Sequence, residues 1–451
     1  MTKSKLTGLS DSVKESLLNK ALNARDKSRL KREQEPIDPT IRTLFGRRIN
    51  EDFCRFDKFD GYKEIKMLEQ GGATLGVSSP FFKTHESIAG AVTSIDGKEY
   101  INFSSYNYLG LSGHPEVIEA SKQAIDQFGT TVSASRMVSG ERGIQQKLEH
   151  QLAELYKADD CVVFVSGHAT NVSTIGYLFG ARDLIVHDSL AHNSILQGAK
   201  LSGAKRLSFR HNDWEHLDEI LTSQREKFER VLIVIEGLYS MDGDIPDLPR
   251  FIEIKKRHHA FLMVDEAHSV GVLGEQGHGI GEYFDINFSD VDIWMGTLSK
   301  SFASCGGYIA GETALVKHLR HYAPGFLYSV GISPPLAAAS SCAIDLMQKE
   351  PERVARLRQR GKLFLELAKA AGIDTGKSEG YSVIPVMAGS SKNAVVLSNQ
   401  LFDKGINVQP ILRPAVEDKA ARLRFFIRSE HTEEQIRFTV DCTRKLLNKL
   451  G

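Results

Sequence analysis

Residues 213–237 read DWEHLDEILTSQREKFERVLIVIEG, a stretch with helical spacing followed directly by a short apolar strand. The same order of elements recurs along the middle of the chain. Apolar runs lie at 161–166, 183–188, 261–268 and 291–297, and a second helical stretch lies at 144–157. Strands that alternate with helices predict βαβ units, and therefore an α/β fold with a mainly parallel central sheet flanked by helices.

The sequence on either side of this region has different patterns of apolar residues. Residues 91–103, AVTSIDGKEYINF, carry two β-rich runs around Asp96-Gly97, the strongest short-range signal for a hairpin. Residues 313–372 are mostly helical in pattern, and further strands are predicted at 381–387 and 421–428. These changes predict four parts: an N-terminal helical extension (1–50), a segment with the β-hairpin (51–108), a large α/β domain (109–335) and a smaller C-terminal α+β domain (336–451).

The N-terminal extension has apolar residues at helical spacing, namely Val13, Leu17, Leu18, Ala21 and Leu22. Two interpretations stay open: a solvated helical arm, and a helix that docks a partner protein. Lys and Arg dominate the second half of the extension, which favours the arm.

Composition excludes several classes of protein. The 57 Lys and Arg residues balance the 57 Asp and Glu residues, so a nucleic-acid-binding protein is not indicated. No run of 18 apolar residues predicts a membrane span, and the N-terminus lacks a secretory apolar core. The five scattered cysteines form no C-x-x-C pair, which predicts reduced thiols, no metal site and a cytoplasmic protein.

In a parallel sheet, ligands bind beyond the carboxyl ends of the strands, and two predicted strands carry suitable side chains there. Asp265 follows four apolar residues, where a carboxylate needs a cationic or hydrogen-bonding partner, although helix capping is the commoner explanation. Lys300, in WMGTLSKSFAS, follows an apolar strand among small residues, as a lysine nucleophile with a depressed pKa requires. A surface lysine is the alternative.

Two loops supply the other candidates. The run SGHATN at 166–171 can present backbone N–H groups and a helix N-terminus to a phosphate, although an ordinary βα loop would look the same. His192 follows the strand at 183–188, and a lone loop histidine is more often structural than catalytic. Taken in order, a phosphate turn, a histidine, a strand-end Asp and a Lys are typical of fold-type I enzymes that use pyridoxal 5′-phosphate.

Five strings of sequence narrow the resemblance. They are SSYNYLGLSGHPEV (104–117), IEGLYSMDGDIPDL (235–248), VDEAHSVGVLGEQGHG (264–279), TLSKSFAS (297–304) and LYSVGISPP (327–335). From about residue 90 to residue 445 the chain resembles the α-oxoamine synthase family. The resemblance implies a pyridoxal-phosphate-dependent acyltransferase of fold type I.

The resemblance also implies roles for single residues. Lys300 would hold the cofactor as a Schiff base, Asp265 would contact its pyridine nitrogen, and His192 would stack over the ring. His268 and Ser240 would lie beside its phenolic oxygen. The remaining implied contacts are to the phosphate, from Ser166, Gly167, His168, Thr297 and, across a subunit boundary, Ser329, and to the substrate carboxylate, from Asn107 and Arg413.

Three places depart from the family pattern. GTTVSASRMVSG (129–140) has Ser133 and Ala134 where the family has glycines along the acyl chain, so the length of that chain stays open. His168 replaces an aromatic residue, and RPAVEDKA (413–420) replaces a proline-rich string around Arg413.

The activity implied by the resemblance is a decarboxylative Claisen condensation of a small amino acid with an acyl thioester, which gives an α-amino ketone and carbon dioxide. The thioester would be carried by coenzyme A or by an acyl carrier protein, and the enzyme would be a homodimer with shared active sites. The alternatives are an aminotransferase, a synthase of sphingoid bases, a non-catalytic subunit, and a scaffold whose N-terminal helix recruits a carrier protein. The presence of Lys300, Asp265 and His192 weakens the non-catalytic reading.

Overall fold

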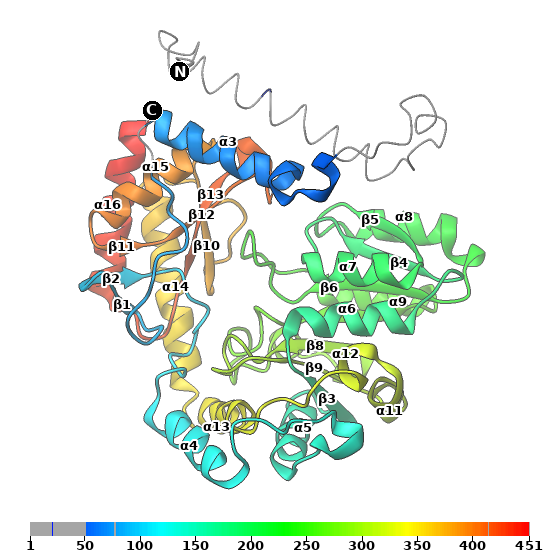
Figure 1. The fold of residues 1–451 in the computed structure, drawn as a ribbon. Coiled ribbons are helices and arrows are strands. Elements are labelled where there is room, and N and C mark those ends of the chain that lie inside the picture. The colour runs from blue at the N-terminus through cyan, green and yellow to red at the C-terminus, as the bar shows by residue number, and fades with distance from the viewer. Residues whose placement is uncertain (1–19, 21–50, 76–77, 414, 451) are drawn as a thin grey trace. The chain divides into compact units, whose positions relative to one another are not determined.

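The computed structural model describes residues 20, 51–75, 78–413 and 415–450. The chain divides into two units, one up to Phe81 and one from Phe82 onwards. In the first unit, two short turns, η1 (Glu51–Cys54) and η2 (Phe56–Lys58), precede helix α3 (Asp60–Leu75), as Figure 1 shows. The apolar residues that predict a helical arm, from Val13 to Leu22, lie outside the described residues, so that prediction stays untested.

A seven-stranded sheet forms the centre of the second unit, with the strand order β3-β9-β8-β7-β6-β4-β5. Neighbouring strands run parallel except at β9, which is antiparallel to both β3 and β8. This confirms the mainly parallel sheet that the sequence predicts. The strands are β3 (Asp160–Phe164), β4 (Leu184–Asp188), β5 (Lys205–Phe209), β6 (Val231–Glu236), β7 (Phe261–Asp265), β8 (Ile293–Thr297) and β9 (Gly307–Gly311).

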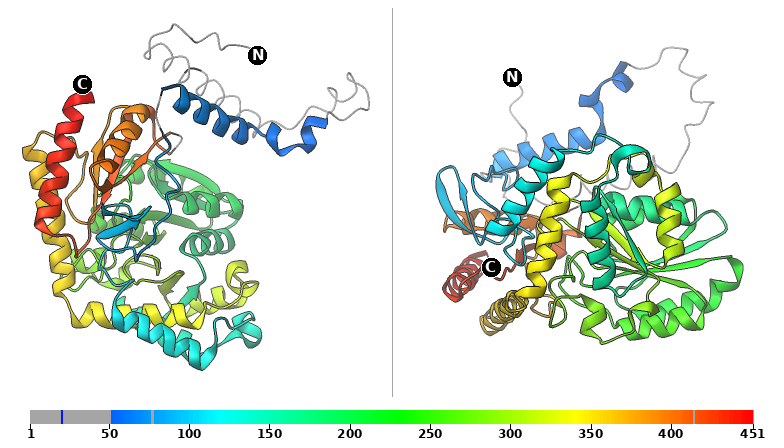
Figure 2. Two further views of the ribbon diagram at one scale, coloured as in Figure 1. Left: turned by 60° about the vertical axis from the view of Figure 1, so that its left-hand side comes forward. Right: turned by 90° about the horizontal axis from the view of Figure 1, so that it is seen from below.

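Alternate residues of strands such as β3 enter two different hydrophobic clusters, one on each face of the sheet. Val162 and Phe164 of β3 belong to one cluster, whereas Cys161 and Val163 belong to the other. Because side chains alternate across a strand and both faces are buried, β6 is apolar at every position before Glu236. Helices cover both faces, as Figure 2 shows.

The helices of the second unit connect these strands and continue into the C-terminal part. They are α4 (Pro115–Phe128), α5 (Gly143–Leu155), α6 (Gly167–Leu178), α7 (Asn193–Ser202), α8 (Trp214–Gln224), α9 (Leu248–Arg257), α10 (Ile280–Tyr283), α11 (Thr313–Tyr322), α12 (Pro324–Leu327), α13 (Pro334–Lys349), α14 (Glu352–Ala370), α15 (Ser391–Phe402) and α16 (Glu433–Leu450). None of the helices in the described part of the chain is long and apolar enough to cross a membrane.

Two smaller sheets accompany the central one. Strands β10 (Val383–Met387), β13 (Arg422–Phe426) and β12 (Gln409–Ile411) form an antiparallel sheet in that order. The predicted hairpin is present as β1 (Val92–Ile95) and β2 (Lys98–Asn102), which pair antiparallel. Asp96 and Gly97 both have positive φ, as a tight two-residue turn requires.

The hairpin packs with the C-terminal part of the chain. Strand β2 pairs in parallel with β11 (Ile406–Asn407), about three hundred residues later, and Figure 1 shows both at the same side of the second unit. One three-stranded sheet thus combines strands from the segment before residue 108 and from the C-terminal part, while the four predicted parts stay a prediction.

Candidate active site

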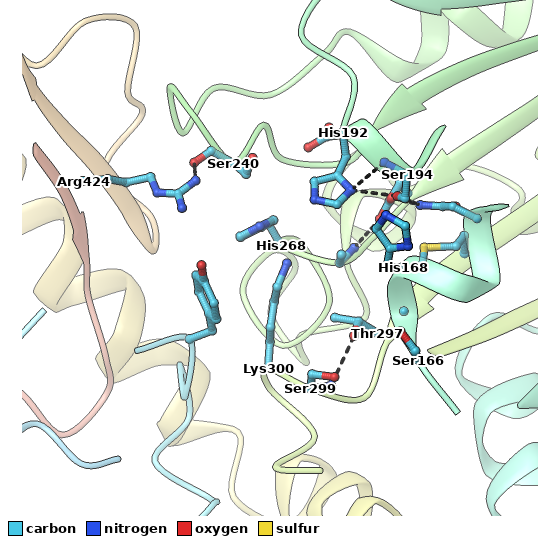
Figure 3. A pocket seen from close by; sticks show the side chains of 17 residues that line it. Ser166, His168, His192, Ser194, Ser240, His268, Thr297, Ser299, Lys300 and Arg424 are labelled. Carbon is cyan, nitrogen blue, oxygen red and sulfur yellow. Dashed lines mark hydrogen bonds between the residues drawn. The ribbon is translucent and has the colours of Figure 1, made fainter. Parts of the chain in front are cut away.

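A cavity of about 280 Å³ lies at the carboxyl ends of the central strands. Glu236, Asp265 and Thr297 are the last residues of β6, β7 and β8, and all three line it. The parallel sheet thus brings together side chains that are far apart in sequence, at the position where such sheets bind ligands. Figure 3 shows that Lys300 reaches into this cavity and that Arg424 approaches it from β13.

Lys300 and Asp265 form the charged centre of the cavity. Asp265 is 4% exposed, and its two oxygens accept hydrogen bonds from the Asn171 side chain at 2.8 Å and from the Ala267 amide at 3.0 Å. Removal of water from around Lys300 lowers the pKa of its amine to about 8, although Asp265 and Glu236 act in the opposite direction. A large fraction of the Lys300 amine is therefore neutral near pH 8, as a nucleophile or base requires.

His192 lies beside these residues, at the start of α7. Its Nδ1 is 2.7 Å from the Ser194 hydroxyl, which in turn accepts a hydrogen bond from Asn171 at 2.9 Å. Removal of water from around the ring lowers the pKa of His192, so the imidazole is mostly neutral at pH 7. The side-chain amide of Asn171 therefore links Asp265 to the Ser194 hydroxyl, and through that hydroxyl to His192.

His268 is fixed by a buried tyrosine. The Tyr108 hydroxyl lies 2.7 Å from His268 Nδ1, and burial raises the pKa of Tyr108 far above its ordinary value. Burial also lowers the pKa of His268 well below its ordinary value, so the ring is neutral. A neutral imidazole has one N–H. If the tyrosine keeps its proton and donates it to Nδ1, then Nε2 carries the N–H of His268.

The turn between β3 and α6 closes against Thr297. A Cβ atom at Gly167 would lie 2.7 Å from the Thr297 hydroxyl, so this position has room only for glycine. The Ser166 hydroxyl caps α6 by accepting a hydrogen bond from the Ala169 amide. The first amides of a helix have no partner within the helix, and they attract anions. Ser166, Gly167, His168 and Thr297 all line the cavity, which suits a phosphate group.

Arg424 is a cavity residue that the sequence prediction missed. Its Nη1 donates a hydrogen bond to the Ser240 carbonyl oxygen at 2.8 Å, and its guanidinium lies over the Phe426 ring. Ser240 also lines the cavity. A guanidinium at the edge of a cavity is well suited to bind a carboxylate.

Three predicted residues do not line this cavity. Arg413 is not among the residues that line the cavity, whereas Arg424 is. The side-chain Nδ2 of Asn107 donates a hydrogen bond to the Ala89 carbonyl at 3.0 Å, and its Oδ1 accepts one from the Ser112 backbone amide at 3.2 Å. Both polar atoms of this side chain are therefore already bonded to the backbone. The assignment of Ser329 involves a second subunit and stays a prediction.

Several other lining residues have no role among the assignments made from the sequence. Asn171 lies in the SGHATN run, within α6, and Glu236 is the last residue of β6, so only Glu236 carried the signal of a strand end. Burial and the nearby Asp265 raise the pKa of Glu236 to about 8, so its carboxyl group is largely protonated at pH 7. The others are Tyr106, Ser194, Ala267, Met295 and Ser299.

The cavity fits pyridoxal phosphate. Asn171 Oδ1 and Glu236 Oε1 are buried polar atoms without a hydrogen-bond partner in the described protein, and both residues line the cavity. Such atoms are costly unless a ligand or water satisfies them. The residues that would hold the cofactor are Lys300 at its aldehyde, Asp265 at its pyridine nitrogen and the turn from Ser166 to His168 at its phosphate. Fold and cavity together define a pyridoxal-phosphate-dependent transferase of fold type I.

Comparison with known proteins shows which family within this class of enzymes the chain resembles. Residues 98–441 match the family of class I and II aminotransferases. The 8-amino-7-oxononanoate synthase of Thermoanaerobacter pseudethanolicus is 37% identical over 366 residues, which are 81% of this chain and 91% of that protein. A solved structure of serine palmitoyltransferase with pyridoxal phosphate has a TM-score of 0.82 at 29% identity, with 88% of this chain and 98% of that one covered. Serine palmitoyltransferase from Sphingomonas wittichii has a TM-score of 0.83 at 28% identity, with 87% and 98% covered.

The chain belongs to the α-oxoamine synthase family, within the class I and II aminotransferases. The family, the fold and the use of pyridoxal phosphate that the sequence predicts are thereby confirmed.

The contact between Tyr108 and His268 leads to a prediction for the variant Tyr108→Phe. Loss of the hydroxyl leaves the His268 Nδ1 without its partner, so the ring can change its tautomer and orientation. We expect kcat to fall about tenfold, less than the full contribution of about 10²–10⁴-fold from a positioned acid or base, because the imidazole itself stays in place, while KM for the amino acid changes little. Steady-state kinetics of the holoenzyme measure both.

Tyr156→Phe is the matched control, because Tyr156 makes an equally buried hydroxyl contact with Tyr308 at 2.8 Å and does not line the cavity. An equal fall in kcat in this control would show that Tyr108 acts only through stability.

Proposed function

We propose that this enzyme joins a small amino acid to an acyl thioester in a decarboxylative Claisen condensation. In this reaction the amino acid α-carbon forms a bond with the thioester carbonyl carbon and the thiol leaves. The bond to the amino acid carboxylate breaks, so the products are an α-amino ketone, carbon dioxide and a free thiol. The observation that carries the proposal is the meeting of Lys300, Asp265 and Arg424 in one cavity, in a chain similar to named synthases of this type.

Each residue of the cavity has a role in this reaction. Pyridoxal phosphate, when bound, supplies an electron-withdrawing ring that stabilises negative charge at the α-carbon. The Asp265 carboxylate favours a protonated pyridine nitrogen, since an anion nearby stabilises a cation. Arg424 holds the substrate carboxylate, and the neutral amine of Lys300 takes the α-proton. His268 donates its Nε2 hydrogen to a carbonyl oxygen on which negative charge develops.

Three finer points belong to the same proposal. The enzyme acts as a homodimer, in which an exposed apolar patch of Met137, Val138, Tyr328 and Val330 is covered and Ser329 reaches the phosphate of the other subunit. Ser135 donates a hydrogen bond to the Leu327 carbonyl, which holds the two segments of this patch together. The acyl donor is carried by coenzyme A or an acyl carrier protein, and the free thiols of the five cysteines suit the cytoplasm.

Release of carbon dioxide tests the proposed reaction. We expect the holoenzyme to release carbon dioxide from alanine, glycine or serine only when an acyl thioester is present. Serine as the preferred amino acid would point to sphingoid-base synthesis, and alanine to the chemistry of the 8-amino-7-oxononanoate synthases. Accumulation of pyridoxamine phosphate without carbon dioxide would instead identify an aminotransferase.

A further inference from the structure

The SMDGD string forms a closed turn that none of the roles above explains. Within it, the Tyr239 amide donates to the Asp244 carbonyl at 3.0 Å and the Gly243 amide donates to the Tyr239 carbonyl at 2.8 Å. Gly243 has φ +71°, and a Cβ atom there would collide with the Val383 carbonyl oxygen. The turn, residues 239–244, therefore has a fixed shape and lies directly against β10.

A partly buried histidine holds the turn to the central sheet. His211, in the loop between β5 and α8, contacts Asp188 with Nδ1 at 3.0 Å and Asp244 with Nε2 at 2.8 Å. Asp188 is the last residue of β4, and Asp244 closes the turn. Asn212, at positive φ, adds hydrogen bonds of 2.8 Å to both carboxylates. The ring edge of His211 also meets Tyr239, with centroids 4.5 Å apart.

His211 is the cation of this cluster. Burial alone would lower the pKa of His211, but its hydrogen bonds to Asp188 and Asp244 raise it to about 9. Both ring nitrogens therefore carry protons and donate to carboxylates. His211, Asp242 and Asp244 lie close enough together to hold a metal ion, yet both nitrogens of His211 are in use and Asp242 pairs with Arg422. The geometry thus favours a network of ion pairs over a metal site.

Strand β13 holds the turn from the opposite side. Arg422 pairs with Asp242 and donates to the Met241 carbonyl at 3.2 Å. Two residues further along the same face of β13, Arg424 donates to the Ser240 carbonyl, which also belongs to the turn. The guanidinium that reaches the cavity is therefore oriented by a backbone oxygen whose position depends on the turn.

We propose that His211 is a positioning residue, which anchors the turn 239–244 to the central sheet and, through the Ser240 carbonyl, orients Arg424 toward the carboxylate of the amino acid substrate. This inference rests on the proposed function, in which Arg424 binds that carboxylate.

The positioning role of His211 can be tested by adding two small amines to the holoenzyme and following the absorbance of its bound cofactor. Alanine has a carboxylate for Arg424 to bind, and ethylamine has none. In His211→Gln we expect the Kd for alanine to rise about tenfold, because a small displacement of a binding group has effects of this size or larger. The Kd for ethylamine stays at the wild-type value. Asp244→Asn, which breaks the same ion pair, is expected to behave alike and replaces His211→Gln if that variant does not fold.

A matched control and a double-mutant cycle make the test specific. His258 forms a similar partly buried pair with Asp218, at 2.7 Å, and lies just before the start of β7, at the opposite edge of the sheet from the turn that follows the end of β6, so His258→Gln is expected to keep both affinities. In the Arg424→Gln background, His211→Gln is expected to have no further effect on alanine, because the residue that it positions is gone.

Several results would overturn the role of His211. They are equal losses for alanine and ethylamine, a loss of alanine affinity in His258→Gln, additive effects in the cycle, and a fall in the alanine affinity of the wild type when a chelator removes metal ions. Unchanged alanine binding in Arg424→Gln would overturn the assignment of Arg424 and the role of His211 with it. These are binding measurements, so an enzyme that binds as expected and releases no carbon dioxide would contradict the proposed reaction alone.

Discussion

Lys300→Ala is expected to lower kcat/KM by at least about 10³-fold and to abolish the absorbance of covalently held pyridoxal phosphate. Among the residues that the structure describes, Lys300 is the one lysine that lines the cavity, and it serves as both the attachment point and the base for the α-proton. Figure 3 shows Lys300 reaching into the cavity, and no other lysine is among the side chains drawn there, so none of them can take over both roles. Absorbance spectra of the purified variant and steady-state kinetics measure the two effects.

Lys255→Ala is the control for this variant. Lys255 is also largely buried, pairs with Asp292 at 2.8 Å, and does not line the cavity, so its loss is expected to affect stability but not cofactor absorbance. The assignment of Lys300 fails if Lys300→Ala keeps both the absorbance and full turnover.

The same lysine makes cofactor uptake depend on pH. The pKa of Lys300 in the folded protein is about 8, so the reactive neutral amine becomes more abundant as the pH rises from 6.5 through 8 and levels off above it. We expect the rate at which apoprotein takes up pyridoxal phosphate to follow this curve. An ordinary surface lysine would instead give a rate that still rises near pH 10.

The fold was predictable wherever the local pattern and the tertiary environment agree. Strand β6 is apolar at almost every position because both faces are buried, and its residues therefore reveal the strand. Strand β9, in contrast, reads GYIAG, and glycine has a low strand propensity. All five residues of β9 are nevertheless buried. Its first residue has to be glycine because Gly307 lies so close to Gly167 that no larger residue fits. This is a tertiary constraint that periodicity does not report.

Residues of the site were likewise predictable only where the local sequence pattern indicates their position in the fold. Asp265 follows from its position at the end of an apolar strand, since parallel strands bring their carboxyl ends together, whereas Thr297 was indicated only by the family resemblance. Arg424 was missed although the predicted strand at 421–428 contains it, because alternation shows only that Arg422 and Arg424 share a face. Which arginine reaches the cavity depends on the packing of β13 against the turn 239–244, and that contact joins residues about 180 positions apart.

Arg424→Gln is expected to lower kcat/KM for the amino acid by about 100-fold, and Arg413→Gln by far less. A charge-assisted hydrogen bond contributes about 1.5–3 kcal/mol, and a loss of about 2.7 kcal/mol corresponds to a factor of about 100. Glutamine can still donate to the Ser240 carbonyl but cannot bind a carboxylate with a charged fork. The measurement is kcat/KM of both variants, each with saturating acyl thioester and purified as holoenzyme.

The two arginines provide controls for each other because both lie in the C-terminal part of the chain and only Arg424 lines the cavity. Arg424→Lys sharpens the comparison, since it keeps the charge and loses the fork, and we expect it to recover only part of the activity. If Arg413→Gln showed the larger loss, the carboxylate would be bound by the residue that the family resemblance first suggested. Arg413 would then have to approach the cavity when substrate binds, a movement that protection of the backbone amides of residues 415–420 from hydrogen exchange would reveal.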